Sequence, residues 1–218
     1  MKKNSATLLA VNLLTRVFDI LPDEKMEKVM FHVISHRARS RPALDALKFL
    51  FGLDTALYHL QGQMAIIYGE GVHPKHRLMN YHDFFIKRIV QEDHVLDIGC
   101  GIGAVAYDVA KSTGASVLGI DIDDNSIHAA RERFQHARLE FRVGDVLKAL
   151  PHEKYSVVIL SNVLEHLPQR SDFLKRVQKA VNPGRILTRV PLFERDWRVP
   201  LKKEVGVEWR LDDTHQIE

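Results

Sequence analysis

The sequence contains a single cysteine, Cys100, so the chain cannot form an internal disulfide and nothing argues for an oxidising compartment. It also lacks any run of roughly 18 apolar residues, the length that a membrane-spanning helix needs. The N-terminus begins like a secretion signal, but Asn12, Arg16 and Asp19 interrupt its apolar stretch and no small-residue cleavage site follows. We therefore expect a cytoplasmic protein with an amphipathic first helix and no membrane span.

Dense basic runs are absent as well. Residues 1–93 carry 13 Lys and Arg against 10 Asp and Glu, and residues 94–218 carry 18 against 18, which gives a net charge of +3. A nucleic-acid surface generally needs a clear basic excess, so a nucleic-acid partner is not favoured. The composition, 45% hydrophobic and 27% charged, is that of an ordinary folded domain and leaves the oligomeric state open.

From His94 onward, short apolar runs rich in branched residues alternate with helical patterns. The predicted strands are His94–Ile98, Ser116–Ile120, Leu139–Val143, Tyr155–Leu160 and Ile186–Val190. Between them, one predicted helix starts at Asp123 or Asp124, and another is stopped by Asn182-Pro183-Gly184. This alternation predicts an α/β fold, a Rossmann-like open and mostly parallel sheet with helices on both faces.

The first 93 residues show apolar residues at helical spacing, with turn signals at Leu21-Pro22 and Arg41-Pro42. We predict a helical N-terminal segment over residues 1–93, which packs on the sheet or forms a lid, and an α/β domain over residues 94–218. After the fifth predicted strand the chain shows no further strand pattern. Open sheets of this class usually continue, so we expect C-terminal strands to be missing.

Three closely spaced glycines follow the first predicted strand: Gly99, Gly101 and Gly103. Glycines at a strand-to-helix turn let the backbone bend sharply and approach a ligand near a helix N-terminus. The spacing alone leaves two ligands open, because Gly99, Gly101 and Ala104 also satisfy the dinucleotide pattern G-x-G-x-x-G/A. Asp97, two residues before the first glycine, would repel a pyrophosphate but would attract an ammonium group.

Two further aspartates end the next predicted strands. Asp121 is placed to accept hydrogen bonds from ribose hydroxyls, and Asp145 is placed to accept one from an adenine amino group. Together with Asp97 they predict a cofactor that contains adenosine and carries a positive charge near the glycine loop.

With D-x-G-x-G-x-G in place from Asp97 to Gly103, the region Val95 to about Pro191 resembles the class I S-adenosylmethionine-dependent methyltransferases. The resemblance implies S-adenosylmethionine as cofactor and S-adenosylhomocysteine as product. It implies that Asp97 and the loop cradle the methionine part, Asp121 the ribose and Asp145 the adenine edge. The other cofactor-binding residues that it implies are Cys100, Ile122, Val146, Ser161 and Asn162.

The segment "SNVLEHL", residues 161–167, is similar to that of ubiquinone-biosynthesis-type O-methyltransferases. In some members of that group and in small-RNA 2′-O-methyltransferases, an E-x-x-E-H motif binds a divalent metal, with a downstream histidine in the RNA enzymes. This chain keeps Glu165 and His166, and His215 stands downstream, but Asn162 occupies the first glutamate position. Losing a carboxylate weakens a site for a hard cation, so we assign no metal. Glu165, His166 and His215 remain candidate catalytic residues.

A histidine-rich cluster, "YGEGVHPKHRLMNYHDFF", precedes the first predicted strand. We predict that it covers the cofactor and acceptor and include His73 among the catalytic candidates; a metal site is not favoured because no acidic partner has suitable spacing. The leading hypothesis is a methyltransferase for a small-molecule or sugar (polysaccharide) acceptor, at oxygen. The alternatives are a small-RNA-type 2′-O-methyltransferase, a non-catalytic cofactor-binding scaffold and, more distantly, an NAD-dependent oxidoreductase.

Overall fold

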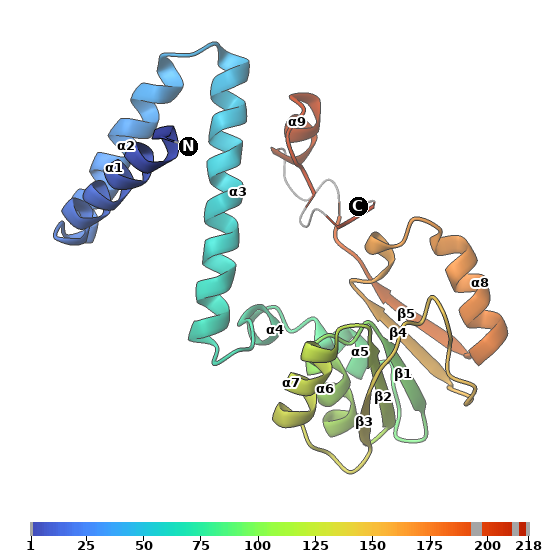
Figure 1. Ribbon diagram of the computed structural model, residues 1–218. Helices are drawn as coiled ribbons and strands as arrows, with labels where there is room; N and C mark the ends of the chain where they lie inside the picture. Colours follow the sequence, from blue (N-terminus) through green and yellow to red (C-terminus); the bar gives the residue numbers. More distant parts are fainter. Residues whose placement is uncertain (1, 193–197, 211–213, 217–218) are drawn as a thin grey trace. The chain divides into compact units, whose positions relative to one another are not determined.

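The computed structural model describes residues 2–192, 198–210 and 214–216 (Figure 1). The chain divides into two compact units, residues 1–58 with 204–207, and residues 59–203 with 208–218. In chain order the elements are α1 (Lys2–Asp19), α2 (Asp23–Arg39), α3 (Ala43–Tyr68), α4 (Lys75–Leu78), α5 (His82–Ile86), β1 (His94–Ile98), α6 (Ala104–Thr113), β2 (Ser116–Asp121), α7 (Asp124–Arg133), β3 (Leu139–Val143), β4 (Val157–Ser161), the 3-10 helix η1 (Leu164–His166), α8 (Arg170–Val181), β5 (Arg185–Arg189) and α9 (Arg198–Glu204).

The first unit is built from α1, α2 and the first part of α3. Both α2 and α3 begin directly after a proline, Pro22 and Pro42, whose fixed φ suits the start of a helix. Arg37 and Arg41 lie over the ring of Phe49, at 5.6 and 5.3 Å from its centroid. The helical N-terminus is confirmed, whereas its action as a lid and the boundary at residue 93 stay predictions. Within the described ranges, no helix has both the length and the apolar character that crossing a membrane requires.

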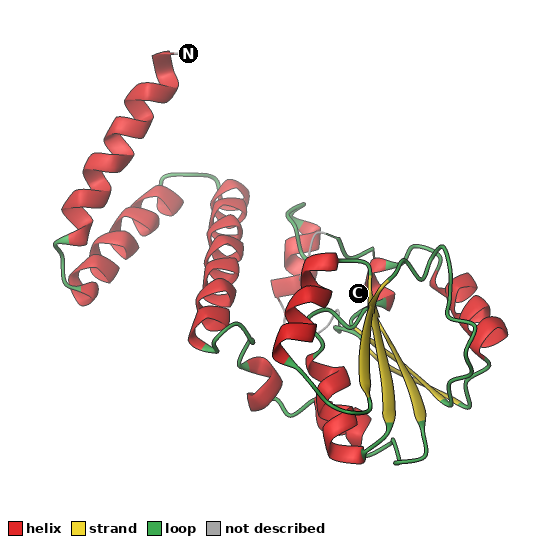
Figure 2. Ribbon diagram, turned by 60° about the horizontal axis from the view of Figure 1, so that its bottom comes forward, coloured by secondary structure: helices red, strands yellow, loops and turns green. Residues whose placement is uncertain are grey.

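The second unit contains a five-stranded sheet in the order β3-β2-β1-β4-β5, and every pairing is parallel (Figure 2). Helices α6 and α7 cover one face of this sheet and α8 covers the other (Figure 1). Because the carboxyl ends of all five strands meet at one edge, the loops that follow them gather there. The predicted open α/β fold is thus confirmed.

Successive side chains of a strand point to opposite faces of the sheet, and helices cover both of these faces. Val95 and Val117 belong to the core under α6 and α7, while their neighbours Leu96 and Leu118 belong to the core under α8. A strand buried on both faces has apolar residues at successive positions, which is why these runs are continuously apolar.

The structure changes the bounds of three of the predicted strands. β2 is Ser116–Asp121 rather than Ser116–Ile120. β4 is Val157–Ser161 rather than Tyr155–Leu160, and β5 is Arg185–Arg189 rather than Ile186–Val190. The pairing of these two strands begins at Ser156, whose carbonyl accepts the N–H groups of Gly184 and Arg185, at 3.0 and 3.1 Å, and the register then starts with Val157 opposite Arg185. Asp123 caps α7 by accepting the N–H groups of the second and third residues of that helix, as predicted.

Candidate cofactor and acceptor site

Three glycines shape the loop between β1 and α6. Gly99, Gly101 and Gly103 have φ angles of 69°, 51° and 80°, a region that residues with a Cβ rarely adopt. The N–H of Gly99 donates to the carbonyl of Ile120 at 2.8 Å, so the loop is fastened to the end of β2. The loop therefore brings the N-terminus of α6 to the carboxyl edge of the sheet.

Two of these glycines face different surroundings. A Cβ on Gly103 would stand 2.4 Å from the Phe141 ring and 3.1 Å from the Ala130 methyl, so this position is closed by packing. A Cβ on Gly101 would meet no atom within 4 Å. The backbone of Gly101 thus faces open space, into which a ligand can come close to the main chain.

Asp97 lies in β1 beneath this loop and is 1% exposed. Its Oδ2 is buried and has no hydrogen-bond partner among the described residues. Burial, with a smaller contribution from the nearby charge of Asp121, raises the pKa of the Asp97 carboxyl to about 8. A buried carboxylate without a partner is costly unless a cation reaches it. The neighbouring Cys100 thiol is also partly buried, which raises its pKa, so this thiol stays protonated.

The other predicted cofactor residues follow β2 and β3. The carboxylate of Asp121 accepts the N–H of Gly101 at 2.8 Å and that of Asp123 at 2.9 Å. Asp145 accepts the N–H of Leu147 at 3.0 Å and pairs with Lys148 at 3.1 Å, and the Lys148 contact lowers the pKa of its carboxyl.

Two apolar residues accompany these aspartates. Ile122 follows β2 and is 68% exposed, so its side chain is free to cover a ligand. Val146 instead packs against the core under α8. The structure thus places Asp97, Asp121 and Asp145 at the ends of three adjacent strands.

At the end of β4, Ser161 is followed by Asn162, which adopts a left-handed φ of 58°. The Asn162 N–H donates to the Arg189 carbonyl at 2.8 Å, and the Asn162 Oδ1 accepts from the Arg189 guanidinium at 2.9 Å. Asn162 is therefore joined to β5 through both its backbone and its side chain.

Glu165, His166 and His215 form a cluster beyond β4, and one ligand atom from each lies within 4.8 Å of the others. Glu165 is 2% exposed and neither of its carboxylate oxygens has a hydrogen-bond partner among the described residues, while burial raises its pKa. The His166 Nδ1 lies 2.8 Å from the Thr214 hydroxyl, and the rings of the two histidines meet edge to face with centroids 4.5 Å apart. The three residues that the sequence singled out are thus brought together.

This cluster offers one carboxylate and two imidazoles, a donor set that a Zn²⁺-type cation accepts. It suits Mg²⁺ or Ca²⁺ poorly, because these ions prefer more oxygen ligands. Asn162 supplies no further carboxylate, and its side-chain oxygen is already hydrogen-bonded to the positively charged Arg189. The residues therefore fit a borderline cation only.

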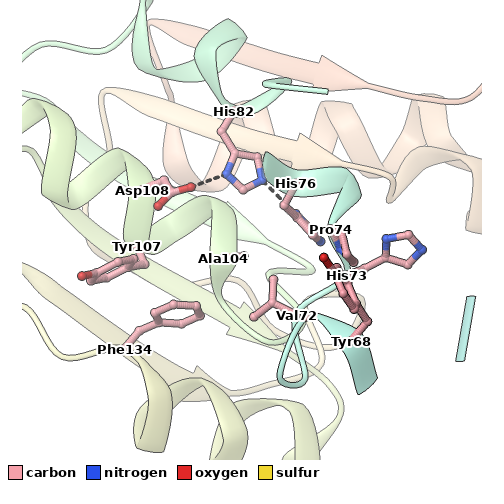
Figure 3. Close-up of a pocket in the computed structure, with 11 residues that line it drawn as sticks. Tyr68, Val72, His73, Pro74, His76, His82, Ala104, Tyr107, Asp108 and Phe134 are labelled. Carbon is pink, nitrogen blue, oxygen red and sulfur yellow. Dashed lines mark hydrogen bonds and ion pairs between the residues drawn. The ribbon is translucent and has the colours of Figure 1, made fainter. Parts of the chain in front are cut away.

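His73 lies in a different group, around a cavity of about 470 Å³ that borders the first turns of α6 (Figure 3). In this group the His82 Nδ1 is 2.6 Å from the Asp108 carboxylate, and the His82 Nε2 is 2.9 Å from the His76 Nδ1. Burial, followed by the charge of His82, lowers the pKa of His76 to about 4, so this imidazole is neutral at physiological pH. The structure does not place His73 in the Glu165 cluster.

Comparison with known proteins shows what the sequence around this site resembles. Residues 95–184 match a family model described as a methyltransferase domain. This region is a methyltransferase domain, similar to those of S-adenosylmethionine-dependent methyltransferases. The ubiquinone biosynthesis O-methyltransferase of Bradyrhizobium diazoefficiens is 31% identical over 119 residues, which cover 54% of this chain and 46% of that protein. Methyltransferase GfsG of Streptomyces halstedii is 32% identical over 95 residues, 41% of this chain and 34% of the relative.

Among solved structures, the methyltransferase domain is similar to the magnesium protoporphyrin IX methyltransferase of Synechocystis PCC 6803, crystallised with bound S-adenosylhomocysteine. The two are 23% identical, with a TM-score of 0.48 over 58% of this chain and 61% of that chain. The chain spans about half the length, or less, of the two curated relatives described above.

Sequence reasoning missed three residues that the structure places beside the candidate site residues or the histidine-rich cluster, and one of them, Thr214, contacts His166. Arg189 ends β5 and reaches Asn162, while Asp108 on α6 reaches His82. The only signal for Arg189 was a basic residue at the carboxyl end of a strand, and Asp108 has the spacing of an ordinary helix-surface residue.

Proposed function

We propose that this protein is an S-adenosylmethionine-dependent methyltransferase that transfers the methyl group to a hydroxyl oxygen of a small-molecule or sugar acceptor. The observation that carries the proposal is the buried, unpartnered carboxylate of Asp97 beneath the open backbone of Gly101. This arrangement suits a ligand whose cationic ammonium group comes close to the main chain. A pyrophosphate would meet the same carboxylate with repulsion.

The residues on either side of Asp97 divide the site between cofactor and acceptor. Asp121 and Asp145 would hold the ribose and the adenine, because they end the strands β2 and β3 on one side of β1. On the other side, β4 leads through Ser161 and Asn162, which stay predicted cofactor contacts, to the Glu165 cluster, and β5 ends at Arg189. We assign this second side to the acceptor.

Methyl transfer to a hydroxyl group needs a positioned acceptor and a group that removes its proton. His166 is our candidate base, because Thr214 orients its Nδ1 and leaves the Nε2 for the acceptor proton. Glu165 and His215 surround it. A borderline cation held by these three residues would be an alternative to this base: it would, when bound, make the acceptor hydroxyl more acidic, and His166 would then be a ligand.

The curated relatives support oxygen as the target, since those of the ubiquinone type are O-methyltransferases by name. The chain covers only part of their length, so the acceptor and the activity of the whole protein are part of the proposal. The predicted cytoplasmic location also remains a prediction, and it depends on the single cysteine.

A second candidate function is a small-RNA-type 2′-O-methyltransferase, and the cluster of Glu165, His166 and His215 favours it. The near-balanced charge of the chain argues against this candidate, because RNA binding needs a basic surface. Salt-sensitive retention of a small RNA by the purified chain would favour this candidate over a small-molecule acceptor.

The proposed function is tested by incubating the chain with S-adenosylmethionine and a set of phenolic and sugar acceptors, and measuring formation of S-adenosylhomocysteine and methylated product. We expect turnover that is lost in Asp121→Ala. The matched control is Asp124→Ala, an exposed aspartate in the first turn of α7, which should keep the rate. Cofactor binding without turnover of any acceptor would favour a non-catalytic scaffold instead.

A further inference from the structure

Arg189 is the last residue of β5 and lies at the acceptor side of the site. Its guanidinium donates to the Asn162 Oδ1 at 2.9 Å, while its carbonyl accepts the Asn162 N–H at 2.8 Å. The other N–H groups of the guanidinium meet no acceptor within the ranges that the structure describes, and no ion pair joins them to Glu165 there. Arg189 therefore presents a fixed positive charge with unfilled donors.

The aromatic ring of Tyr81 fixes the other face of this guanidinium, whose central carbon lies 4.1 Å from the ring centroid. Tyr81 in turn contacts His76 through its hydroxyl, and His76 is bonded to His82, which is bonded to Asp108. The last two of these contacts are visible in Figure 3. This chain of contacts holds the Tyr81 ring in one orientation, so the histidine cluster positions Arg189.

The sheet order shows which part of a ligand would meet this residue. The strand order β3-β2-β1-β4-β5 puts Arg189 two strands from Asp97, on the side opposite to Asp121 and Asp145. Strands in a sheet are roughly 4.8 Å apart, so Arg189 is about 10 Å from the strand that carries Asp97. Arg189 thus lies beyond the three aspartates that we assign to the cofactor, on the side where the acceptor would bind.

We propose that Arg189 binds a carboxylate, and that this carboxylate belongs to the methyl acceptor. A guanidinium pairs with a carboxylate through two parallel hydrogen bonds. The Arg189 guanidinium stacks on Tyr81 and donates one N–H to Asn162, so within the described part of the chain further N–H groups are free to form such a pair. The inference deepens the proposed function on which it rests. It narrows the acceptor to a small hydroxylated acid, such as a phenolic acid or a sugar acid.

The cofactor also carries a carboxylate, at its amino-acid end, and Arg189 could pair with that group instead. The experiment therefore has two arms. In the first, the chain saturated with S-adenosylhomocysteine is titrated with two matched pairs in which only one member carries a carboxylate: 3,4-dihydroxybenzoate against catechol, and glucuronate against glucose. In the second, the chain is titrated with S-adenosylhomocysteine and with 5′-methylthioadenosine, which has no amino-acid end.

Both arms use wild type, Arg189→Met and Arg189→Lys. The matched control is Arg88→Met, because Arg88 also stacks on a ring, that of Phe84 at 4.2 Å. Its carbonyl accepts from Arg185 at the start of β5, so it lies at the opposite edge of the sheet.

We expect wild type to prefer the acid of at least one pair by about tenfold or more. Arg189→Met should lose this preference while keeping its affinity for S-adenosylhomocysteine, Arg189→Lys should keep part of it, and Arg88→Met should keep it fully. The unchanged cofactor affinity shows that the variant is folded, and Arg189→Lys decides the matter if Arg189→Met does not fold.

Three results would overturn the proposal. The proposal of an acidic acceptor fails if wild type binds S-adenosylhomocysteine but neither acid. It also fails if Arg189→Met keeps the preference for the acid. An Arg189→Met variant that loses affinity for S-adenosylhomocysteine but not for 5′-methylthioadenosine assigns the carboxylate to the cofactor instead. If wild type binds neither nucleoside, the proposed function itself fails.

Discussion

Replacing Asp97 by Asn should stabilise the ligand-free methyltransferase domain while it destroys cofactor binding. The pKa of this carboxyl rises from 3.8 to about 8 on folding, because the group is buried without a partner. Between these two pH values the folded domain keeps a proton that the unfolded chain releases, so the free energy of unfolding falls as pH rises. Each pH unit contributes about 1.4 kcal/mol. Over the roughly three units from 3.8 to pH 7, the cost reaches about 4 kcal/mol.

Asparagine has nearly the same shape and cannot ionise, so Asp97→Asn avoids this cost. Urea unfolding followed by circular dichroism at pH 4 to 8 should show the variant gaining stability over wild type by about 1.4 kcal/mol per pH unit. The variant should also bind S-adenosylhomocysteine about a hundredfold more weakly, because the ligand ammonium loses its buried counter-charge. The control is Asp124→Asn, an exposed aspartate. Parallel stability curves for Asp97→Asn and wild type would refute the reasoning.

Three further predictions concern the loop, the base of the sheet and metal. Gly101→Ala and Gly103→Ala should each cost about 1 kcal/mol in thermal unfolding, because both glycines have a left-handed φ. Gly103→Ala should cost about 1–3 kcal/mol more, because its methyl would collide with Phe141, whereas Gly101→Ala should in addition weaken S-adenosylhomocysteine binding; equal losses of stability would contradict this difference. Asp93→Ala should cost about 3 kcal/mol in urea unfolding at pH 7, because Asp93 accepts hydrogen bonds from Ser156, from Arg185 and from a backbone N–H. Since these bonds lower the pKa of Asp93, its contribution is present at neutral pH and is lost as pH falls through the folded pKa, so the two curves should converge in acid. Dialysis against a chelator should leave the Kd of S-adenosylhomocysteine within about twofold by calorimetry, because the aspartates that we assign to the cofactor lie on or after β1 to β3; a larger loss would make the Glu165 cluster part of the cofactor site.

The strand and loop positions could be predicted because they depend on local rules. Continuous apolar runs mark strands that are covered on both faces, and an aspartate before a helix marks its cap, as Asp123 shows. Closely spaced glycines after an apolar strand mark a turn with left-handed backbone. Each signal lies within a few residues of the structure that it predicts.

The side-chain partnerships could not be predicted in this way. The Arg185 guanidinium lies 2.5 Å from the carboxylate of Asp93, and no local pattern links two residues so far apart in the sequence. Arg189 acquires its role from Tyr81 and Asn162, which only the fold brings to it. Glu165 and His215 were paired by resemblance to a family, because nothing in their spacing requires them to meet.

The central claim is that the glycine loop and Asp97 bind an adenosine cofactor with a cationic amino-acid end. Calorimetric titration of the purified chain with S-adenosylhomocysteine and, in parallel, with NAD tests it most directly. The account predicts a saturable Kd in the micromolar range for S-adenosylhomocysteine and no binding of NAD. Binding of NAD instead would contradict it, because the loop would then accept a pyrophosphate beside the Asp97 carboxylate.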